Sequence, residues 1–199
     1  MDAASRQAII ENYRALYRKH GSGPDVAQLS AEGQRFRFEK LAAIGSMTGA
    51  KVLDLGCNLG DLYPFLCERY GNIDYTGIDI VPEIISAAKQ THPGARFLCR
   101  DVLRDGLTES FDYILISGMF NNAMTGATDF LEQMTRIAFA HCTKAVAFNF
   151  ISSHVSFEDP GMQYHDPLTV FRYCIEQLTK KVSIFHHYER CDVAVFAYR

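Results

Sequence analysis

From Lys51 to Phe150 the chain alternates short apolar segments with longer amphipathic ones, and this alternation limits the possible folds more than any other feature. The apolar segments are rich in Val, Ile, Phe, Tyr or Leu, which is typical of buried strands. Most of the intervening segments have helical length and spacing. We therefore expect strands at Lys51–Leu55, Tyr75–Ile80, Ala95–Leu98, Phe111–Ser117 and Lys144–Phe150, and helices at Asp61–Tyr70, Pro82–Gln90 and Thr128–Ala140.

Strands that alternate with helices favour right-handed crossovers and a mostly parallel sheet that is covered by helices on both faces. The segment Arg100–Ser110 has the weakest helical pattern. After a loop at Ser152–His165, Asp166 is placed to cap a helix that has Pro167 at its first position. Two strands, "KVSIFHHY" and "DVAVFAYR", follow without a helix between them and are joined by "ERC". We predict an α/β fold with a doubly wound, mostly parallel sheet of about seven strands that ends in an antiparallel hairpin.

Two helices are expected before the sheet begins. Apolar residues recur at helical spacing over Ser5–His20, and "GSGP" at Gly21–Pro24 then interrupts the pattern. A second helix is expected over Ser30–Ile44, before Gly45. Because no repeat, low-complexity tract or linker follows, the rest of the chain is expected to form one compact core.

Composition excludes several classes of protein. The hydrophobic fraction of 48% and charged fraction of 22% are typical of a folded domain. The formal net charge is −3 and the basic residues are scattered, so nucleic acid is not an expected partner. The first ten residues lack the order of a signal peptide, and no apolar run approaches membrane-spanning length. We therefore expect a soluble, cytoplasmic protein that does not associate with membranes.

The six cysteines are far apart, with no C-x-x-C pair and none close enough to a histidine to suggest a zinc site. In a cytoplasmic protein we expect them to be reduced thiols, most of them buried. No metal site is predicted. The sequence carries no signal for a particular oligomeric state.

The stretch "VLDLGCNLGDL", Val52–Leu62, predicts a strand, a glycine turn and the start of a helix. Such a turn offers backbone N–H groups and the positive end of a helix, and glycine lets a ligand approach the main chain. Gly56 and Gly60 have Asn58 between them, whereas dinucleotide loops follow G-x-G-x-x-G. Asparagine adopts the left-handed conformation more readily than other non-glycine residues. We expect a nucleotide-like ligand that is not a dinucleotide.

Carboxylates stand at or just beyond the ends of three of the expected strands. Asp54 and Asp61 flank the turn, which suits an ammonium or sulfonium charge better than a pyrophosphate. Asp79 lies 19 residues beyond the second glycine, where an acid can accept hydrogen bonds from both ribose hydroxyls. Asp101 could accept from an adenine amino group while the backbone N–H of Val102 donates. Because the carboxyl ends of parallel strands meet in one crevice, these acids are expected to line a single pocket.

These residues also have simpler structural explanations. An acid at a strand end is often only a turn former or a helix cap. Asp54 could serve merely to fix the loop, and Cys57 is expected to pack rather than react. The occurrence of Asp79 and Asp101 after successive strands favours a binding pocket over these alternatives.

The order of "VLDLGCNLGDL", "YTGIDIVPEII", "RFLCRDVL" and "FDYILISGMF", followed by the hairpin, resembles the class I S-adenosylmethionine-dependent methyltransferases. The resemblance extends over Lys51–Arg199 and implies a Rossmann-like fold with S-adenosyl-L-methionine as cofactor. The two leading helices resemble the lid of such enzymes, so residues 1–48 are predicted to form a helical lid and residues 49–199 the cofactor-binding core. Where this family often has glycine, the chain has Asn58.

The resemblance also implies a set of cofactor contacts. The turn would lie under the methionine part, and the residues after the fourth strand would lie near the methyl group. Asp79 would hold the ribose, Ile80 would lie against the adenine, and Asp101 would read the adenine edge. The implied contacts are Asp54, Gly56, Cys57, Asn58, Gly60, Asp61, Asp79, Ile80, Asp101, Val102, Ser117 and Gly118.

The position after the fourth strand discriminates between acceptors. Family members that methylate exocyclic nitrogens of nucleic-acid bases tend to show Asn or Asp, two prolines and an aromatic residue there, whereas this chain has "SGMF". Ser117 cannot play the amide-recognising role that the Asn or Asp has in those enzymes. Together with the charge balance, this favours a small-molecule acceptor. In-line positioning of that acceptor behind the methyl group can supply about 7–11 kcal/mol of the catalysis without a protein nucleophile.

Acceptor-side candidates are polar and aromatic residues expected near the mouth of the crevice. Arg37 could grip a carboxylate of cofactor or substrate, although a solvated helix face would look the same. His154 is the first choice for a catalytic base because the pKa of histidine lies near neutral pH, although a surface-loop histidine is more often incidental. A base is useful only if the acceptor carries a proton at neutral pH. The predicted acceptor-side residues are Tyr17, Arg37, Phe120, Asn121, Asn149, Tyr164 and His165.

Two other functions fit part of the pattern. A non-catalytic domain could bind a nucleotide-like ligand or a partner through the same crevice, but it would not need the ribose and adenine acids together. A nicotinamide oxidoreductase is disfavoured by the glycine spacing, by a chain too short for a separate substrate domain, and by the terminal hairpin.

Overall fold

The structure is a computed structural model that describes residues 3–21, 23–186 and 191–199. Its centre is one sheet with the strand order β3-β2-β1-β4-β5-β8-β7, and a short β6 pairs with β5 outside this path. The strands are β1 Lys51–Leu55, β2 Asp74–Asp79, β3 Arg96–Cys99, β4 Phe111–Ile116, β5 Cys142–Ser152, β6 Tyr164–His165, β7 Val182–Phe185 and β8 Asp192–Tyr198. The helical segments are α1 Ala3–His20, η1 Pro24–Ala27, α2 Ala31–Ala42, α3 Leu62–Tyr70, α4 Pro82–Thr91, α5 Val102–Asp105, α6 Ala127–Ala140, α7 Pro167–Tyr173 and η2 Cys174–Leu178.

The sheet is parallel from β3 to β5 and antiparallel at β8 and β7. The strand order reverses at β1, which has β2 on one side and β4 on the other, so that Val52 pairs with both Tyr75 and Tyr113. In such sheets ligands bind where the order reverses, beyond the carboxyl ends of the strands. The α/β, doubly wound architecture with a C-terminal antiparallel hairpin is therefore confirmed.

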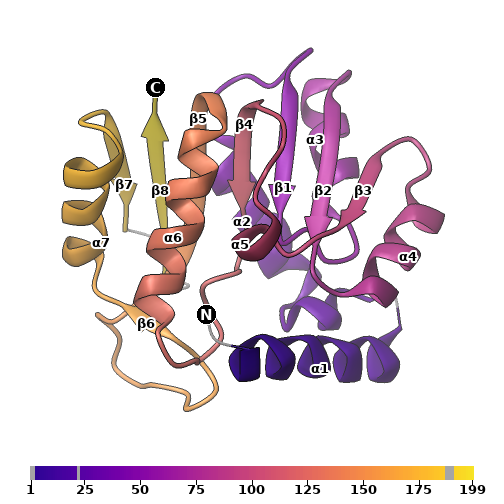
Figure 1. The fold of residues 1–199 in the computed structure, drawn as a ribbon, viewed down its shortest axis with the longest axis horizontal. Helices are drawn as coiled ribbons and strands as arrows, with labels where there is room; N and C mark the ends of the chain where they lie inside the picture. The colour runs from indigo at the N-terminus through magenta and orange to yellow at the C-terminus, as the bar shows by residue number, and fades with distance from the viewer. Residues whose placement is uncertain (1–2, 22, 187–190) are drawn as a thin grey trace.

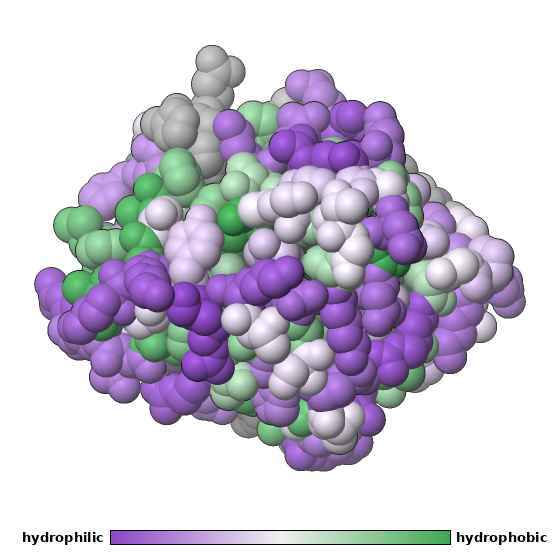
Figure 2. All heavy atoms as spheres, turned by 90° about the horizontal axis from the view of Figure 1, so that it is seen from above, coloured by the Kyte–Doolittle hydropathy of each residue, from purple (hydrophilic) through white to green (hydrophobic). Residues whose placement is uncertain are grey.

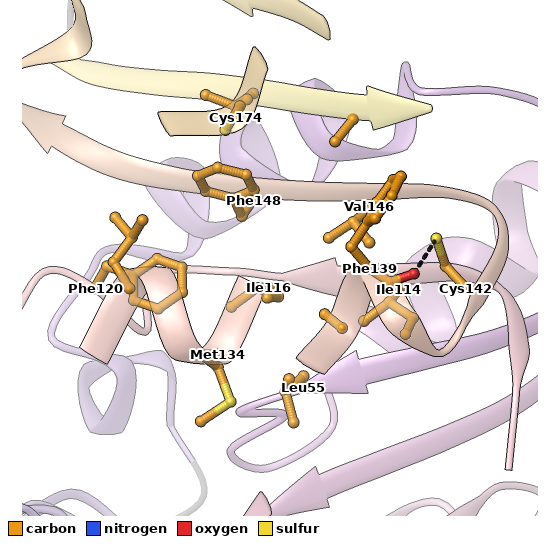
Figure 3. Close-up of a cluster of buried hydrophobic side chains, with 14 of the residues drawn as sticks. Leu55, Ile114, Ile116, Phe120, Met134, Phe139, Cys142, Val146, Phe148 and Cys174 are labelled. Carbon is orange, nitrogen blue, oxygen red and sulfur yellow. Dashed lines mark hydrogen bonds between the residues drawn. The ribbon is translucent and has the colours of Figure 1, made fainter. Parts of the chain in front are cut away.

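Helices cover both faces of the sheet (Figure 1). Side chains of a strand alternate between the two faces, so that Ile114 and Ile116 of β4 join the cluster with α6 and α7. Tyr113 and Leu115 join the opposite cluster with α2, α3 and α4. Figure 3 shows the first cluster, in which Phe148 lies near Phe120 with a ring-centroid distance of 6.0 Å. Two buried cores thus pack on opposite faces of the sheet.

Helix α1 lies across the carboxyl ends of the first strands (Figure 1). An ion pair between Arg14 Nε and Glu83 Oε1, 2.6 Å apart, joins it to α4. A second ion pair of the same length joins Arg6 Nε to Asp101 Oδ2, just beyond β3. These two pairs hold α1 against the loop after β3 and the start of α4.

Local details follow the sequence closely with a few differences. The side chain of Asp166 caps α7 as expected, since it accepts hydrogen bonds from the backbone N–H groups of Leu168 and Thr169. The weak segment after β3 forms only the four-residue α5. The short β6 was not predicted, because its two residues pair in parallel with Ile151 and Ser152 through a contact distant in sequence. In the predicted hairpin loop "ERC", Glu189 and Arg190 lie outside the described residues.

One face of the surface and the cysteines can be described directly. Viewed from above, at the end away from α1, the surface mixes polar and apolar residues (Figure 2). All six cysteines are free, and three of them are buried. In the described part of the chain, none of the helices combines the length and hydropathy that crossing a bilayer requires. Over the same residues, the acidic, cysteine and histidine side chains form no cluster suited to a metal ion.

Core packing at β5 should dominate the stability of the fold. Phe148 is fully buried, whereas Phe157 is 72% exposed. Phe148→Ala should therefore lower the free energy of unfolding by about 3–5 kcal/mol in urea denaturation, because it leaves a cavity between two packed layers. The control Phe157→Ala should change it by less than about 0.5 kcal/mol. Similar losses for both variants would contradict this packing arrangement.

Candidate functional site

A cavity of about 150 Å³ lies at the carboxyl ends of β1, β2, β3 and β4. Helix α1, the segment after it and α2 form its other wall. Apolar side chains make up much of the cavity wall, and polar groups lie between them. The polar and charged lining residues are Tyr13, Gln34, Arg37, Asp54, Asn58, Asp61, Asp79, Arg100, Asp101, Ser117 and Asn122.

The turn after β1 has the conformation that its residues predict. Gly56, Asn58 and Gly60 have φ angles of 80°, 49° and 81°. Glycine and asparagine are the residues that adopt this left-handed region most readily, so Asn58 replaces a glycine at limited cost. Both Gly56 and Cys57 donate their backbone N–H groups to the carbonyl of Ile78, at 2.8 and 3.0 Å. These bonds attach the turn to β2.

Asp79 ties the turn to the loop after β2. Its Oδ2 accepts from the backbone N–H of Asn58 at 3.0 Å, and its Oδ1 accepts from Val81 at 3.1 Å. Burial raises the pKa of Asp79, while these backbone hydrogen bonds oppose the rise. A ligand with hydroxyl donors would add partners to a carboxylate that is already held in place.

Asp54 is the most deeply buried acid of the site, with 2% of its surface exposed. Its Oδ2 accepts a 2.6 Å hydrogen bond from the Tyr75 hydroxyl. Burial raises the pKa of Asp54 to about 7, and the nearby charge of Asp79 adds to the rise. The carboxyl is therefore only partly ionised near neutral pH, and a cationic ligand would favour its ionised form.

Two further acids complete the set. Asp61 Oδ2 accepts from Gln34 Nε2 of α2 at 3.1 Å. Asp101 caps α5 by accepting from the backbone N–H of Arg104, and its other oxygen is paired with Arg6 of α1. Both acids thus connect the strand ends to the helices that close the cavity.

Arg37 belongs to a buried polar network at the β4 end of the cavity. Its Nε lies 2.8 Å from Asp192 Oδ2, and Asp192 Oδ1 accepts from Asn149 Nδ2 at 2.9 Å. Asn149 Oδ1 in turn accepts from the backbone N–H of Gly118 at 2.7 Å. A Cβ atom at Gly118 would lie 2.9 Å from Arg37 Nη1, so the glycine gives the guanidinium room. The network fixes the guanidinium and the loop after β4 together.

Tyr13 of α1 reaches the same end of the cavity. Its hydroxyl oxygen accepts from Asn122 Nδ2 at 3.0 Å, and Asn122 Oδ1 accepts from Gln28 at 3.4 Å. Burial raises the pKa of Tyr13, so the phenol keeps its proton at neutral pH. Asn122 also pairs with Met162 through an isolated bridge, which joins the loop after β4 to the loop before β6.

The structure brings together most of the residues that the sequence singled out for the cofactor. All of them except Gly60 line the cavity. Gly60 is packed instead against the aromatic ring of Phe97, which a Cβ atom would approach to 2.6 Å. Of the acceptor-side residues, Arg37 lines the cavity.

The other acceptor-side residues lie outside the lining. Tyr17 packs against a small cluster with Val26 and Leu59, and Phe120 is 2% exposed in the main core. Asn149 supports the loop after β4 within the Arg37 network. Asn121 is buried, and the two polar atoms of its side chain have no hydrogen-bond partner among the described residues.

The remaining candidates are His154, in the loop after β5, and Tyr164 and His165, which form β6. The Tyr164 hydroxyl accepts from the backbone N–H of Asp159, and His165 Nε2 lies 3.2 Å from the carbonyl of Phe120. Burial lowers the pKa of His165. His154 is 62% exposed at its side chain and lies 3.6 Å from Asp166, away from the cavity.

Sequence reasoning missed Tyr13, Gln34, Asp192 and Asn122. Tyr13 and Tyr17 share one helical stripe, so periodicity alone could not say which of them faces the cavity. Asp192 begins the last strand, and it meets Arg37 only because β8 lies beside β5. The pair of asparagines after "SGMF" is visible in the sequence and could have identified Asn122 as a residue of the site.

Comparisons with known proteins agree with this architecture. Residues 52–145 match the profile of a family described as a methyltransferase domain. The Mycobacterium tuberculosis protein Rv1506c, which is provisionally named a methyltransferase, is 31% identical over 146 residues that cover 69% of this chain and 86% of that protein. A malonyl-[acyl-carrier protein] O-methyltransferase of Acetivibrio thermocellus is 24% identical over 156 residues, which cover 67% of this chain and 53% of the relative.

A solved structure shows the same fold. Magnesium protoporphyrin IX methyltransferase from Synechocystis PCC 6803 with bound SAH aligns with a TM-score of 0.70 and 15% identity. The alignment covers 96% of this chain and 94% of that chain. At this level of identity the likeness concerns the fold alone.

The buried carboxyl of Asp54 should make stability depend on pH. Because its pKa is raised to about 7 in the folded chain, it holds a proton that the unfolded chain has already lost above about pH 4. Its stabilising contribution is therefore complete at low pH and is lost as the pH rises through 7. Urea denaturation of Asp54→Asn should show up to about 3 kcal/mol less loss of stability between pH 5 and pH 8 than the unaltered protein.

Asp74→Asn provides the matched control, because Asp74 starts the adjacent strand with an exposed side chain. Its denaturation curves should keep the pH dependence of the unaltered protein. If Asp54→Asn also kept that dependence, the burial of an ionisable group at this position would be contradicted.

Proposed function

The chain belongs to the class I S-adenosylmethionine-dependent methyltransferases, and we propose that it transfers a methyl group to a small-molecule acceptor by in-line displacement. S-adenosylmethionine supplies a methyl group that its sulfonium charge activates. The observation that carries the proposal is the meeting of the Gly56–Gly60 turn, Asp79 and Asp101 in one cavity at the point where the strand order reverses.

The residues present suit the parts of this cofactor. Asp79 would accept from the ribose hydroxyls, and Asp101 with the backbone N–H of Val102 would bind the adenine edge. Ile80 and Val102 line the cavity between these acids and offer apolar surface to the ring. The Oδ1 atom of Asn58 is buried at the turn and has no hydrogen-bond partner among the described residues. A ligand donor at this point would satisfy it.

The charges of the cavity suit the other half of the cofactor. Asp54 and Asp61 would lie beside the turn that holds the methionine part, where carboxylates favour its ammonium and sulfonium charges. Arg37 and Gln34 line the opposite wall from α2, one helical turn apart. The guanidinium of Arg37 would offer its terminal nitrogens to a carboxylate.

The protein's contribution to the reaction would be positioning and exclusion of water. The network of Arg37, Asp192 and Asn149 fixes the backbone of Gly118. Helix α1 closes over the reacting end, which supports the proposed division into a lid of residues 1–48 and a core of residues 49–199. Holding two reactants in line can supply about 7–11 kcal/mol, so no protein nucleophile is required.

A small acceptor is supported by the shape and charge of the site. Tyr13 and Asn122 bridge the cavity at the β4 end, which narrows the access that a polymer would need. The formal net charge of −3 does not attract nucleic acid. Ser117 and Gly118 stand where base-methylating relatives of the family tend to have an amide or acid followed by proline.

Calorimetric titration with S-adenosylmethionine and S-adenosylhomocysteine tests the proposal. Both ligands should bind the unaltered protein, and Asp79→Asn should weaken binding roughly tenfold, because a hydrogen bond to a charged group contributes about 1.5–3 kcal/mol and asparagine keeps one acceptor. Asp129→Asn, at an exposed position in the first turn of α6, should bind as the unaltered protein does. A folded protein that binds neither ligand would overturn the proposed function.

A further inference from the structure

Hydrogen-bond donors face the cavity at its β4 end. The Tyr13 oxygen already accepts from Asn122, so its O–H remains to donate, and no acceptor for that proton is found among the described residues. Arg37 uses Nε for Asp192. Its terminal nitrogens form no hydrogen bond within the described chain, and Nη1 lies against Gly118. This end of the cavity thus offers hydrogen-bond donors to a ligand, from the Tyr13 hydroxyl and from a guanidinium that Asp192 holds in place.

The side chains that reach this end are hydrogen-bond donors rather than free bases. Over the residues that the structure describes, neither histidine nor lysine lines the cavity. Burial raises the pKa of Tyr13 and of Cys57, so both keep their protons at neutral pH. The Asp54 carboxyl is bound by Tyr75, and Asp61 is bound by Gln34.

The two candidate histidines, His154 in the loop after β5 and His165 in β6, do not supply the base either. His154 is exposed and pairs with Asp166. His165 is buried against the carbonyl of Phe120, outside the lining of the cavity. A hydroxyl or ammonium acceptor would need a base to become nucleophilic, whereas a group already without a proton at neutral pH would not.

We propose that the methyl acceptor is a carboxylate, held at the β4 end of the cavity by the Tyr13 hydroxyl beside the positive charge of Arg37. This inference rests on the proposed function and names its substrate class. A carboxylate oxygen forms the new C–O bond while the C–S bond breaks and its electron pair goes to sulfur. A methyl ester and a neutral thioether result, and no proton has to be removed. The anionic acceptor accepts hydrogen bonds from the donors and forms charge-assisted bonds with them.

The carboxylate at Arg37 could also come from the methionine part of the cofactor. A test with 5′-methylthioadenosine, which lacks the methionine carboxylate, distinguishes the two sources of the carboxylate that Arg37 binds. In the presence of 5′-methylthioadenosine an acceptor acid should still bind. Arg37→Met should lower the affinity for that acid by at least threefold. If Arg37→Met weakened only S-adenosylhomocysteine and left every acid unchanged, the role of Arg37 toward the acceptor would be overturned.

The main experiment is binding of matched probes to the protein saturated with S-adenosylhomocysteine. Benzoate, octanoate and succinate are titrated by calorimetry beside the corresponding alcohols and primary amides. The acids should bind at least tenfold more tightly than the uncharged compounds. Tyr13→Phe should lower the affinity for the acids about tenfold, as expected for loss of a hydrogen bond to a charged group. The same variant should bind S-adenosylhomocysteine within twofold of the affinity of the unaltered protein.

Tyr17→Phe is the matched control, because Tyr17 lies one turn along the same helix and outside the cavity lining. It should leave the acid affinities unchanged. With S-adenosylmethionine, acids should yield methyl esters, detected by mass spectrometry, at a rate that stays within threefold between pH 6.5 and pH 9. Methylation of the alcohols at a rate that climbs with pH, or failure of all the acids to bind, would overturn the inference. Failure to bind S-adenosylhomocysteine would instead overturn the proposed function.

Discussion

The carboxylate of Asp79 holds together the two segments that form the core of the site. It accepts backbone hydrogen bonds from Asn58 and from Val81, so it joins the turn after β1 to the loop after β2. The turn can take this position because Asn58 adopts a positive φ of 49°. The parallel register of β1 with β2 then places both elements at one edge of the sheet. Together with the bonds from Gly56 and Cys57 to the carbonyl of Ile78, these contacts hold the two segments of the proposed adenosine site side by side.

Burial of like charges is the second physical constraint. Asp54 and Asp79 both have a raised pKa because they are shielded from water, and the charge of Asp79 adds to the effect on Asp54. A cavity of this kind binds a cation more readily than an anion at its β1 end. At the β4 end the hydrogen-bond donors of Arg37 and Tyr13 favour an anion instead. The site is therefore polarised along its length, which matches a sulfonium cofactor at one end and an anionic acceptor at the other.

Much of the fold could be predicted from local pattern, because strand alternation, the left-handed Asn58 and the Asp166 cap depend on neighbours in the sequence. The acids at the strand ends could be predicted for a related reason, since a parallel sheet brings those ends together. The rotation of α1 could not be predicted. It is set by Arg6–Asp101 and Arg14–Glu83, pairs that are 95 and 69 residues apart, and these decide that Tyr13 faces the cavity. The pairing of Arg37 with Asp192 likewise required the position of β8.

In the proposed function helix α1 closes the cavity over a bound cofactor, and amide hydrogen exchange with and without S-adenosylhomocysteine measures this closure most directly. The structure predicts slower exchange in α1 and in the Gly56–Asp61 turn when the ligand is bound. Exchange in α7, which lies beside β7 at the opposite end of the sheet from β3 (Figure 1), should remain unchanged. Equal exchange of α1 in both states would contradict closure, and protection confined to α7 would place the ligand elsewhere.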